Sequence, residues 1–363
     1  MAEFHNRGRG TAPPAAIRKD VRGGMRPPPV ARAVAVRGER RPDAAAGGPP
    51  GAGVASVVVP THNDGANIGT LLERLVAEPC VGELIVVASG CEDDTVLAAC
   101  EVADADAAAS GEGGGRVQVY VEAVRSGKAA AVNFGAGRAT QPVVAVVSGD
   151  VLPHPGALGL VVAALDEPGV GMAGGRPAPV NGTSTIADTA VHLLWRVHHR
   201  LALRQPKLGE MIALRAEAVV PLPQTSVDEA CFQALVESAG WQSRYVPAAL
   251  VANRGPGTVG DFVKQRRQIH TGHLWLRHRL RYTVPSLRPT LVVREYLAEL
   301  GTGPYLRHPG HLLLTAAGVT MELLARGLAR LDFLRRRETH VWDMVKSAKD
   351  PALGPDRVGA RGR

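Results

Sequence analysis

The stretch VVAVVSGDVLPHPG, residues 143–156, leads an apolar strand directly into an acidic residue. The apolar run ends at Ser148, Gly149 and Asp150, and two prolines then prevent any regular continuation. In an open α/β sheet, ligands bind in the crevice at the carboxyl ends of the strands, so an acid at this point indicates a catalytic or ligand-binding role. Taken alone, Asp150 is explained equally well as a helix cap or a turn residue.

Upstream of this stretch, strand and helix patterns alternate along the chain. Apolar runs predict strands over residues 55–60, 82–89, 117–123 and 143–147. Between them, apolar residues at helical spacing predict helices over 67–78, 94–109 and 128–138. This alternation predicts an α/β fold in which helices flank a Rossmann-like, mostly parallel central sheet with right-handed crossovers.

Beyond residue 165 the alternation loosens into a second half with more helix. Here the pattern predicts a long helix over 185–203, a helix that begins near Asp228, a short strand over 243–251 and a helix over 259–277. A half of this kind, helical with a mixed sheet, usually supplies the wall that contacts a second substrate. The two halves need not be independent domains.

The formal net charge of +8 lies at the two ends of the chain. Residues 1–52 contribute +6 and residues 335–363 contribute +4, which leaves −2 for the part between them. Because the folded part carries no net positive charge, we expect no specific nucleic-acid partner. Residues 1–52 almost lack large apolar side chains and are expected to be disordered. Both basic ends can still contact anionic lipid.

The cysteine pattern and the N-terminal composition favour a cytoplasmic location. The four cysteines, Cys80, Cys91, Cys100 and Cys231, show no metal-binding or redox spacing, so a reduced setting is the simpler interpretation. No apolar centre of the kind that a signal peptide needs occurs near the N-terminus.

The longest apolar stretch, residues 311–334, is interrupted by Glu322, Arg326 and Arg330 at a spacing of four. These charges share one face of a helix, which predicts an amphipathic helix in place of a membrane span. Two interpretations stay open: the helix packs on the protein itself, or it docks at the membrane surface in a peripheral contact.

Three other motifs in the sequence resemble known cofactor-binding or metal-binding patterns. The glycines in RGPGTVGDF, residues 254–262, have dinucleotide-binding spacing, but Pro256 removes a backbone donor and no second strand ending in an acid follows. The segment RSGKAA, residues 125–130, lacks the first glycine and the hydroxyl residue of a P-loop. Two histidine clusters, at 192–199 and 270–278, lack interleaved acids or cysteines and are expected to serve packing or phosphate contact instead of metal binding.

Seven blocks in register resemble glycosyltransferase family 2, whose members adopt the GT-A nucleotide-sugar fold. The blocks lie within residues 54–280: VVVPTHNDGANIGTLLERL, ELIVVASGCEDDT, RSGKAAAVNFGAGRA, VVSGDVLPHPGAL, GEMIALR, VDEACFQALVESAG and QRRQIHTGH. The resemblance implies a nucleotide-sugar-binding half (53–165) and an acceptor-side half (166–280). Outside these halves we expect a disordered basic arm (1–52), a helical C-terminal extension (281–345) and a flexible tail (346–363).

The resemblance also implies which residues bind the donor, a nucleotide diphosphate sugar. These residues are Pro60, Thr61, Asp64, Ser89, Asp93, Arg125, Lys128, Ser148, Gly149, Gln265, Arg266, Arg267 and His270. Strand-end carboxylates can accept hydrogen bonds from a base or a sugar hydroxyl, and fixed cations can offset the charge of the diphosphate. A plain solvated basic helix face remains the alternative for residues 265–270.

By the same resemblance, Asp150 is the metal ligand and Glu229 is the general base. Asp150 matches the last acid of a D-x-D motif that binds Mg²⁺ or Mn²⁺, although Ser148 replaces its first acid. Glu229 and the adjacent Asp228 match the acidic pair beside the acceptor, in reversed order, and Gly209 and Glu210 lie in the acceptor-side block. Acids in a first helical turn also occur as simple caps, which is the alternative here.

The function that the resemblance implies is that of an inverting hexosyltransferase. The acceptor is expected to bear a hydroxyl and to be lipid-linked, a glycan or a natural product. In QRRQIHTGH, Gln268 and Ile269 replace the Arg and Trp of processive synthases, which favours a single transfer. Two alternatives are a degenerate, non-catalytic sugar-nucleotide binder and a membrane-surface scaffold protein.

Overall fold

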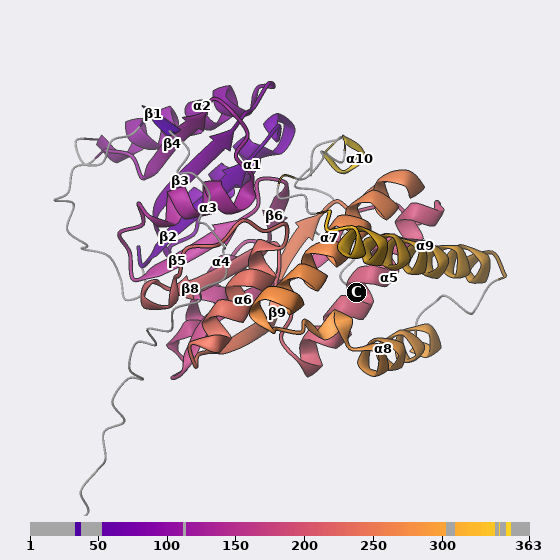
Figure 1. The fold of residues 1–363 in the computed structure, drawn as a ribbon. Helices are drawn as coiled ribbons and strands as arrows, with labels where there is room; N and C mark the ends of the chain where they lie inside the picture. Colours follow the sequence, from indigo (N-terminus) through magenta and orange to yellow (C-terminus); the bar gives the residue numbers. More distant parts are fainter. Residues whose placement is uncertain are drawn as a thin grey trace, which may run out of the picture.

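A computed structural model describes residues 33–37, 53–111, 114–302, 309–337, 341 and 346–349. The nine strands within these residues form a single sheet in the order β1-β4-β3-β2-β5-β8-β7-β9-β6. Figure 1 shows this sheet running through the molecule, with the C-terminal helices gathered on one side. This arrangement confirms the predicted α/β class.

The first half of the sheet is parallel, as the sequence predicts. Neighbouring strands in the order β4, β3, β2 and β5 pair in parallel, and helices connect them along the chain. The elements are β2 (Ala55–Thr61), α1 (Gly65–Val76), β3 (Val81–Ser89), α2 (Thr95–Ser110), β4 (Val117–Glu122), α3 (Lys128–Ala136) and β5 (Val143–Val147). All seven residues of β2 are buried, which explains its unbroken apolar run.

Alternate residues of these strands supply two separate cores. Val57 and Val59 face α1, α2 and α4, whereas Val58 faces α3 and α6 on the other side of the sheet. Because both faces are covered, the free ends of the strands are left to form the site.

The second half of the sheet is mixed. Strand β8 runs antiparallel to both β5 and β7, β7 pairs in parallel with β9, and β6 pairs antiparallel with β9. The elements are β6 (Val151–Pro153), α4 (Ala157–Ala163), η2 (Ala164–Asp166), β7 (Val170–Pro179), α5 (Ile186–Arg204), β8 (Met211–Arg215), η3 (Ala216–Ala218), α6 (Asp228–Ser238) and β9 (Gln242–Asn253).

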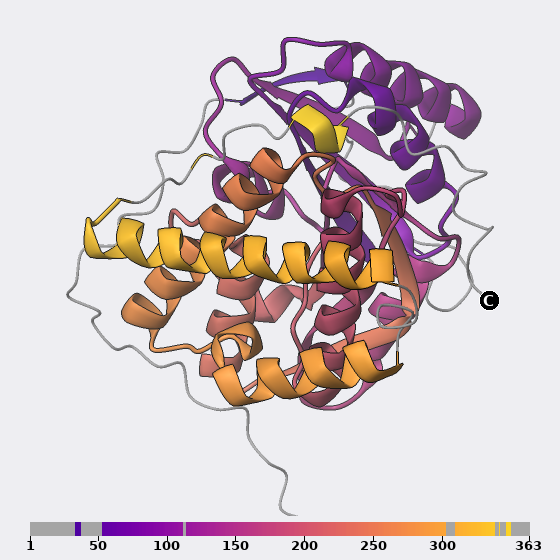
Figure 2. The same cartoon turned by 90° about the vertical axis from the view of Figure 1, so that its right-hand side faces the viewer.

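Helices complete the C-terminal part. They are α7 (Val259–Leu280), η4 (Pro285–Leu287), α8 (Pro289–Thr302), α9 (Pro309–Leu334) and α10 (Lys346–Lys349). Figure 2 shows α9 lying across α7 and α5. By length and composition alone, Gly310–Leu334 is the one segment among the described residues that is long and apolar enough to cross a membrane.

Glu322 and Arg326 of α9 face the protein, whereas Arg330 and several leucines of the helix are exposed. Glu322 is buried and accepts from Arg266 of α7, with Nε–Oε2 at 2.9 Å. Leu313 is 73% exposed and Leu324 is 53% exposed. The helix is amphipathic, as predicted, but its polar face packs inward because it is paired there.

Most of the predicted arm, residues 1–52, lies outside the described residues, and so does most of the predicted tail. Within the arm, Ala33–Arg37 form β1, an antiparallel edge strand on β4. The sequence did not predict this strand. In the tail, Lys346–Lys349 form the short helix α10.

Candidate active site

A cavity of about 330 Å³ opens where the carboxyl ends of β2 and β5 meet the second half of the molecule. Of the eighteen residues that the sequence predicts for the site, fifteen line this cavity. They are Pro60, Thr61, Asp64, Ser89, Arg125, Lys128, Ser148, Gly149, Asp150, Gly209, Glu210, Asp228, Glu229, Gln265 and Arg266. Asp93, Arg267 and His270 are not among the lining residues.

The end of β2 forms one wall of the cavity. The Asp64 carboxylate is 4% exposed and accepts from the Thr61 hydroxyl (Oγ1–Oδ2, 2.8 Å) and from the backbone N–H of His62 (3.0 Å). In the turn after the neighbouring strand β5, the N–H of Gly149 donates to the carbonyl of Pro60 at 3.2 Å. These bonds fix the carboxylate at the edge of the sheet.

Gly149 approaches this wall so closely that a side chain does not fit. A Cβ atom at Gly149 would lie 2.7 Å from both Asp64 Oδ2 and Thr61 Oγ1. We expect Gly149→Ala to lower stability by about 1–3 kcal/mol, the usual cost of overpacking, and to weaken nucleotide binding because Asp64 must move. Chemical denaturation and nucleotide titration measure the two effects. Gly159→Ala, whose new Cβ meets nothing nearer than 3.8 Å, is the control and should resemble the wild type.

The end of β3 is held by hydrogen bonds within the scaffold. The Ser89 hydroxyl donates to Glu122 Oε2 at 2.6 Å, and the N–H of Ser126 donates to Ser89 Oγ at 3.2 Å. Asp93 Oδ2 accepts from the N–H of Gly65 at 3.0 Å, and its Oδ1 accepts from the N–H of Thr95 at 3.1 Å. Asp93 therefore ties the starts of α1 and α2 together.

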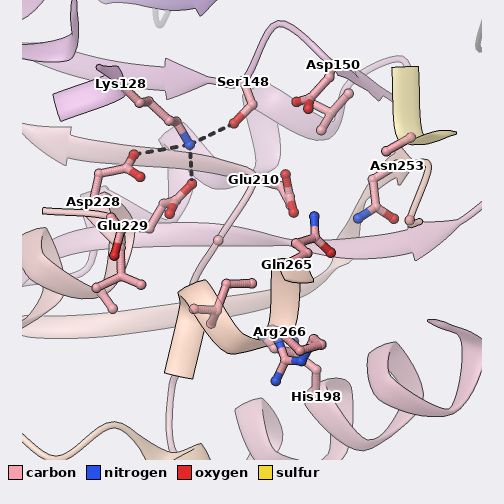
Figure 3. Close-up of a pocket in the computed structure, with 18 of the residues that line it drawn as sticks. Lys128, Ser148, Asp150, His198, Glu210, Asp228, Glu229, Asn253, Gln265 and Arg266 are labelled. Carbon is pink, nitrogen blue, oxygen red and sulfur yellow. Dashed lines mark hydrogen bonds and ion pairs between the residues drawn. The ribbon is translucent and has the colours of Figure 1, made fainter. Parts of the chain in front are cut away.

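Lys128 forms the centre of a charged cluster deeper in the cavity (Figure 3). Its Nζ donates to Glu229 Oε1 at 2.6 Å and to Ser148 Oγ at 3.0 Å, and it lies 3.1 Å from Asp228 Oδ2. Lys128 begins α3 directly after Gly127, whose φ of 94° few other residues adopt. Asp228 and Glu229 begin α6. Ser148, which replaces the expected acid, accepts a hydrogen bond from this lysine.

The two acids beside Lys128 differ in their protonation at neutral pH. Burial disfavours the charged form of Lys128, but Asp228, Glu229 and Glu210 outweigh it and hold the lysine pKa well above its ordinary value. Burial also opposes ionisation of Glu229, yet Lys128 lowers the pKa of this carboxyl below its ordinary value. Burial and the adjacent Glu229 raise the pKa of Asp228 to about 7. Glu229 is therefore the ionised member of the pair at neutral pH.

Glu210 lies between this cluster and Asp150. Burial and the charges of Asp150 and Glu229 raise its pKa to about 8. Its backbone adopts a left-handed φ of 63°, and its carbonyl accepts from the N–H of Ser148 at 3.2 Å. A non-glycine residue held in this conformation is uncommon and marks functional sites.

We expect Glu210→Gln to stabilise the chain increasingly as the pH rises. With its pKa raised above the unfolded value, folded Glu210 keeps a proton that the unfolded chain loses, so wild-type stability falls from about pH 4.5 to about pH 8. A neutral glutamine removes this loss. The melting temperature of Glu210→Gln should exceed that of the wild type by several degrees at pH 8.5 and match it near pH 4. A constant difference across this range would contradict the assignment, and exposed Glu217→Gln is the control.

The residues around Asp150 fit the divalent cation that the sequence predicts. Asp150 and Asn253 both line the cavity, and the residue after Asp150, Val151, pairs with Asn253 across β6 and β9. The Asn253 Oδ1 atom is buried and has no hydrogen-bond partner among the described residues. With Glu210 nearby, Asp150 and Asn253 offer the oxygen donors that Mg²⁺ and Mn²⁺ prefer. No cluster of three His, Cys, Asp or Glu side chains occurs in the described part of the chain, so water and a substrate would have to complete the coordination.

Some polar side chains of helix α7 line the cavity, and others contact α9. Gln265 and Arg266 line the cavity. Arg267 instead pairs with Asp332 of α9, with Nη2–Oδ1 at 2.6 Å. His270 contacts Glu322 of the same helix at 2.8 Å. The two residues outside the cavity therefore help to hold α9 in place.

Some lining residues carry no signal in the sequence. Asn253 is simply the last residue of β9, and Lys207 lies in the loop after α5. His198 and His273 also line the cavity, from α5 and α7, and they belong to the two histidine clusters for which the sequence predicts packing or phosphate contact. Because their partners are distant in the chain, only the three-dimensional structure brings these residues together.

Comparison with known proteins agrees with the resemblance seen in the sequence. Residues 56–217 match the model of a family described as Glycosyl transferase family 2. A mannosyltransferase from Pyrobaculum calidifontis, in complex with GDP-Man and Mn²⁺, has a similar structure: the TM-score is 0.55 at 20% identity, over 82% of this chain and 92% of that one. This similarity confirms the predicted GT-A fold.

A second similar structure is glucosyl-3-phosphoglycerate synthase from Mycobacterium tuberculosis, in complex with Mn²⁺, UDP and glucosyl-3-phosphoglycerate. Its TM-score is 0.43 at 20% identity, over 64% of this chain and 81% of that one. No curated protein sequence matches the chain.

Proposed function

We propose that the chain, whose residues 56–217 match the model of glycosyltransferase family 2, transfers a sugar from a nucleotide diphosphate sugar to an acceptor hydroxyl with inversion. One observation supports this most strongly: Asp150 and Glu229, far apart in the sequence, line the same cavity as Thr61 and Asp64. The cavity therefore combines residues for a nucleotide, a cation and a base.

In this proposal the donor lies across the strand ends. Thr61 and Asp64 would bind the nucleoside, since a fixed carboxylate can accept a hydrogen bond from a base N–H or a ribose hydroxyl. Arg125 also lines this wall and would offset part of the diphosphate charge. Asp150, Asn253 and Glu210 would hold Mg²⁺ or Mn²⁺, which when bound neutralises charge on the leaving diphosphate.

Glu229 is the proposed general base. The acceptor oxygen attacks the anomeric carbon as the bond from that carbon to the diphosphate oxygen breaks, and the electron pair of that bond leaves with the diphosphate. The hydroxyl proton passes to the Glu229 carboxylate, which is ionised because Lys128 holds its pKa low. A single in-line displacement of this kind inverts the anomeric configuration.

Lys128 and Asp228 position the base in this proposal. The 2.6 Å bond from Lys128 fixes one oxygen of Glu229, which leaves the other for the acceptor. Ile269, which takes the place of the tryptophan in processive enzymes, also lines the cavity. A smaller aliphatic side chain here supports one transfer per binding event.

The proposal is tested by a thermal-shift panel of UDP, GDP and dTDP sugars, with and without Mn²⁺. We expect one nucleotide class to raise the melting temperature by several degrees, and Mn²⁺ to increase the shift. A panel in which every compound leaves the melting temperature unchanged would contradict the proposal. It would favour the scaffold alternative.

The outer face of α9 supports a second proposal, peripheral contact with an anionic membrane. Leu313 and Leu324 are exposed on this face, and Leu334 is 76% exposed beside the exposed Arg335 and Arg336. Leucines followed by arginines suit the interface of a negatively charged bilayer.

Membrane contact predicts that the chain floats with phosphatidylglycerol vesicles in a density gradient. Replacing both Leu313 and Leu324 by Glu should abolish flotation, because the new charges oppose burial in the interface. The double variant Val124→Glu and Leu97→Glu, at exposed positions in the first half, should float like the wild type. Equal flotation of all three proteins would exclude α9 as the docking surface.

A further inference from the structure

Four basic residues gather in the cavity on the side opposite Asp150. Lys207 lies in the loop after α5, His198 on α5, and Arg266 and His273 on α7, and all four line the cavity. Figure 3 shows Arg266 and His198 next to each other, away from the carboxylates of Asp150 and Glu229. Burial lowers the pKa of His198 and of His273, and the nearby charges of Lys207 and Arg266 lower both further. The four groups therefore lie close together.

Several of these groups lack partners. Arg266 uses its Nε and Nη2 atoms to bond with Glu322, which leaves Nη1 for another ligand. In contrast, no hydrogen bond or ion pair within the described part of the chain reaches Lys207. His198 is 6% exposed and His273 is 4% exposed, yet the Nδ1 atom of each has no hydrogen-bond partner among the described residues. Buried polar groups are normally hydrogen-bonded, so an unpaired set that lines a cavity indicates a ligand.

The charges of the cavity are separated into two ends. Asp150 makes one end acidic, whereas Lys207 and Arg266 make the other basic. Lys207 interacts electrostatically with Glu229, with Arg266 and with His198. Because Figure 3 shows Arg266 and His198 away from Asp150, Lys207 belongs to the end of the cavity that lies away from Asp150 and close to the proposed base. An anion held at Lys207 would lie on the acceptor side of Glu229.

We propose that the acceptor carries an anionic group, a phosphate or a carboxylate, which Lys207, Arg266 and His198 bind. This inference rests on the proposed function, since it assigns the acceptor end of the same cavity. Charge-assisted bonds to the anion would satisfy Lys207 and orient the acceptor hydroxyl toward Glu229. The wall beside the cations contains Leu201, Val292 and Tyr296, so the group attached to the anion meets an apolar surface.

The test is calorimetric titration of the full chain, saturated with Mn²⁺ and the nucleoside diphosphate that the panel identifies. The probes are inorganic phosphate, glycerol 1-phosphate and farnesyl phosphate, with glycerol and farnesol as uncharged controls. At least one anion should bind, and its uncharged counterpart should bind at least tenfold more weakly. Which anion binds best distinguishes a small soluble acceptor from a lipid phosphate.

The deciding variant is Lys207→Met. We expect it to weaken anion binding by about 10-fold or more, the effect of losing one charge-assisted bond, and to change nucleotide affinity less than threefold. Arg277→Gln, which removes an exposed cation from the same helix as Arg266, should bind both ligands like the wild type. If Lys207→Met does not fold, Lys207→Gln is used with the same expectations.

Two results would overturn the inference. In the first, no anion binds, or Lys207→Met binds it as tightly as the wild type. In the second, Lys207→Met weakens nucleotide and anion equally, which would assign the basic end to the donor diphosphate. Failure of the wild type to bind any nucleotide would instead count against the proposed function.

Discussion

Replacing Glu229 by Gln is expected to lower kcat by about 10²–10⁴-fold, the contribution of a positioned general base. Glutamine keeps the size of the side chain and its hydrogen-bonding capacity, but it cannot take a proton from the acceptor. Donor affinity should stay within threefold of the wild type, because Glu229 lies apart from the strand-end wall that we assign to the nucleotide. Release of nucleoside diphosphate from the donor sugar measures kcat, with water as the acceptor where no other is known.

Asp228→Asn provides the matched comparison for Glu229→Gln. Asp228 contacts the same lysine but has a pKa raised to about 7, so it is partly protonated at neutral pH. We expect a smaller loss of kcat in this variant. Equal losses would assign the proton transfer to the pair as a unit, and full activity of Glu229→Gln would exclude Glu229 as the base.

Replacing Lys128 by Met is expected to have the largest effect on stability. The change leaves Asp228 and Glu229 buried without their cation, and breaking a buried ion pair from one side costs about 3–5 kcal/mol. We expect about 3 kcal/mol, the lower end of that range, because the Lys128 side chain is 35% exposed to the cavity. Urea denaturation at pH 8 measures the loss.

The pH dependence of the Lys128→Met loss identifies its cause. Without the lysine, the pKa of Glu229 should rise, so the loss should shrink at pH 5, where both acids become protonated. Lys128→Arg keeps the charge and should recover most of the stability. A loss that is the same at pH 5 and pH 8 would indicate a packing defect instead of unpaired carboxylates.

The parallel half of the fold could be predicted from the sequence because its strands are buried on both faces. Continuous apolar runs such as residues 55–59 have few alternative interpretations when helical patterns lie between them. Strand β8 was not predictable in the same way, since its antiparallel insertion between β5 and β7 depends on pairing between distant segments. Nothing in the arginine-rich composition of residues 1–52 indicated the edge strand at Ala33–Arg37.

The site was predictable where motifs follow strand ends. Asp64 and Asp150 line the cavity because the sheet brings the ends of β2 and β5 to one edge. Glu229, in the first turn of α6, was predicted from the family resemblance instead. The basic run of α7 was less informative, because successive residues of a helix point in different directions. Arg266 lines the cavity, whereas the adjacent Arg267 pairs with Asp332.

Calorimetry shows whether Asp150 helps to bind a nucleotide diphosphate sugar through a divalent cation. The donor identified in the panel is titrated into the wild type and into Asp150→Ala, each with and without Mn²⁺. We predict that Mn²⁺ tightens binding to the wild type at least tenfold and leaves binding to Asp150→Ala unchanged. If Mn²⁺ tightened donor binding equally in both proteins, Asp150 would be excluded as a ligand of the cation.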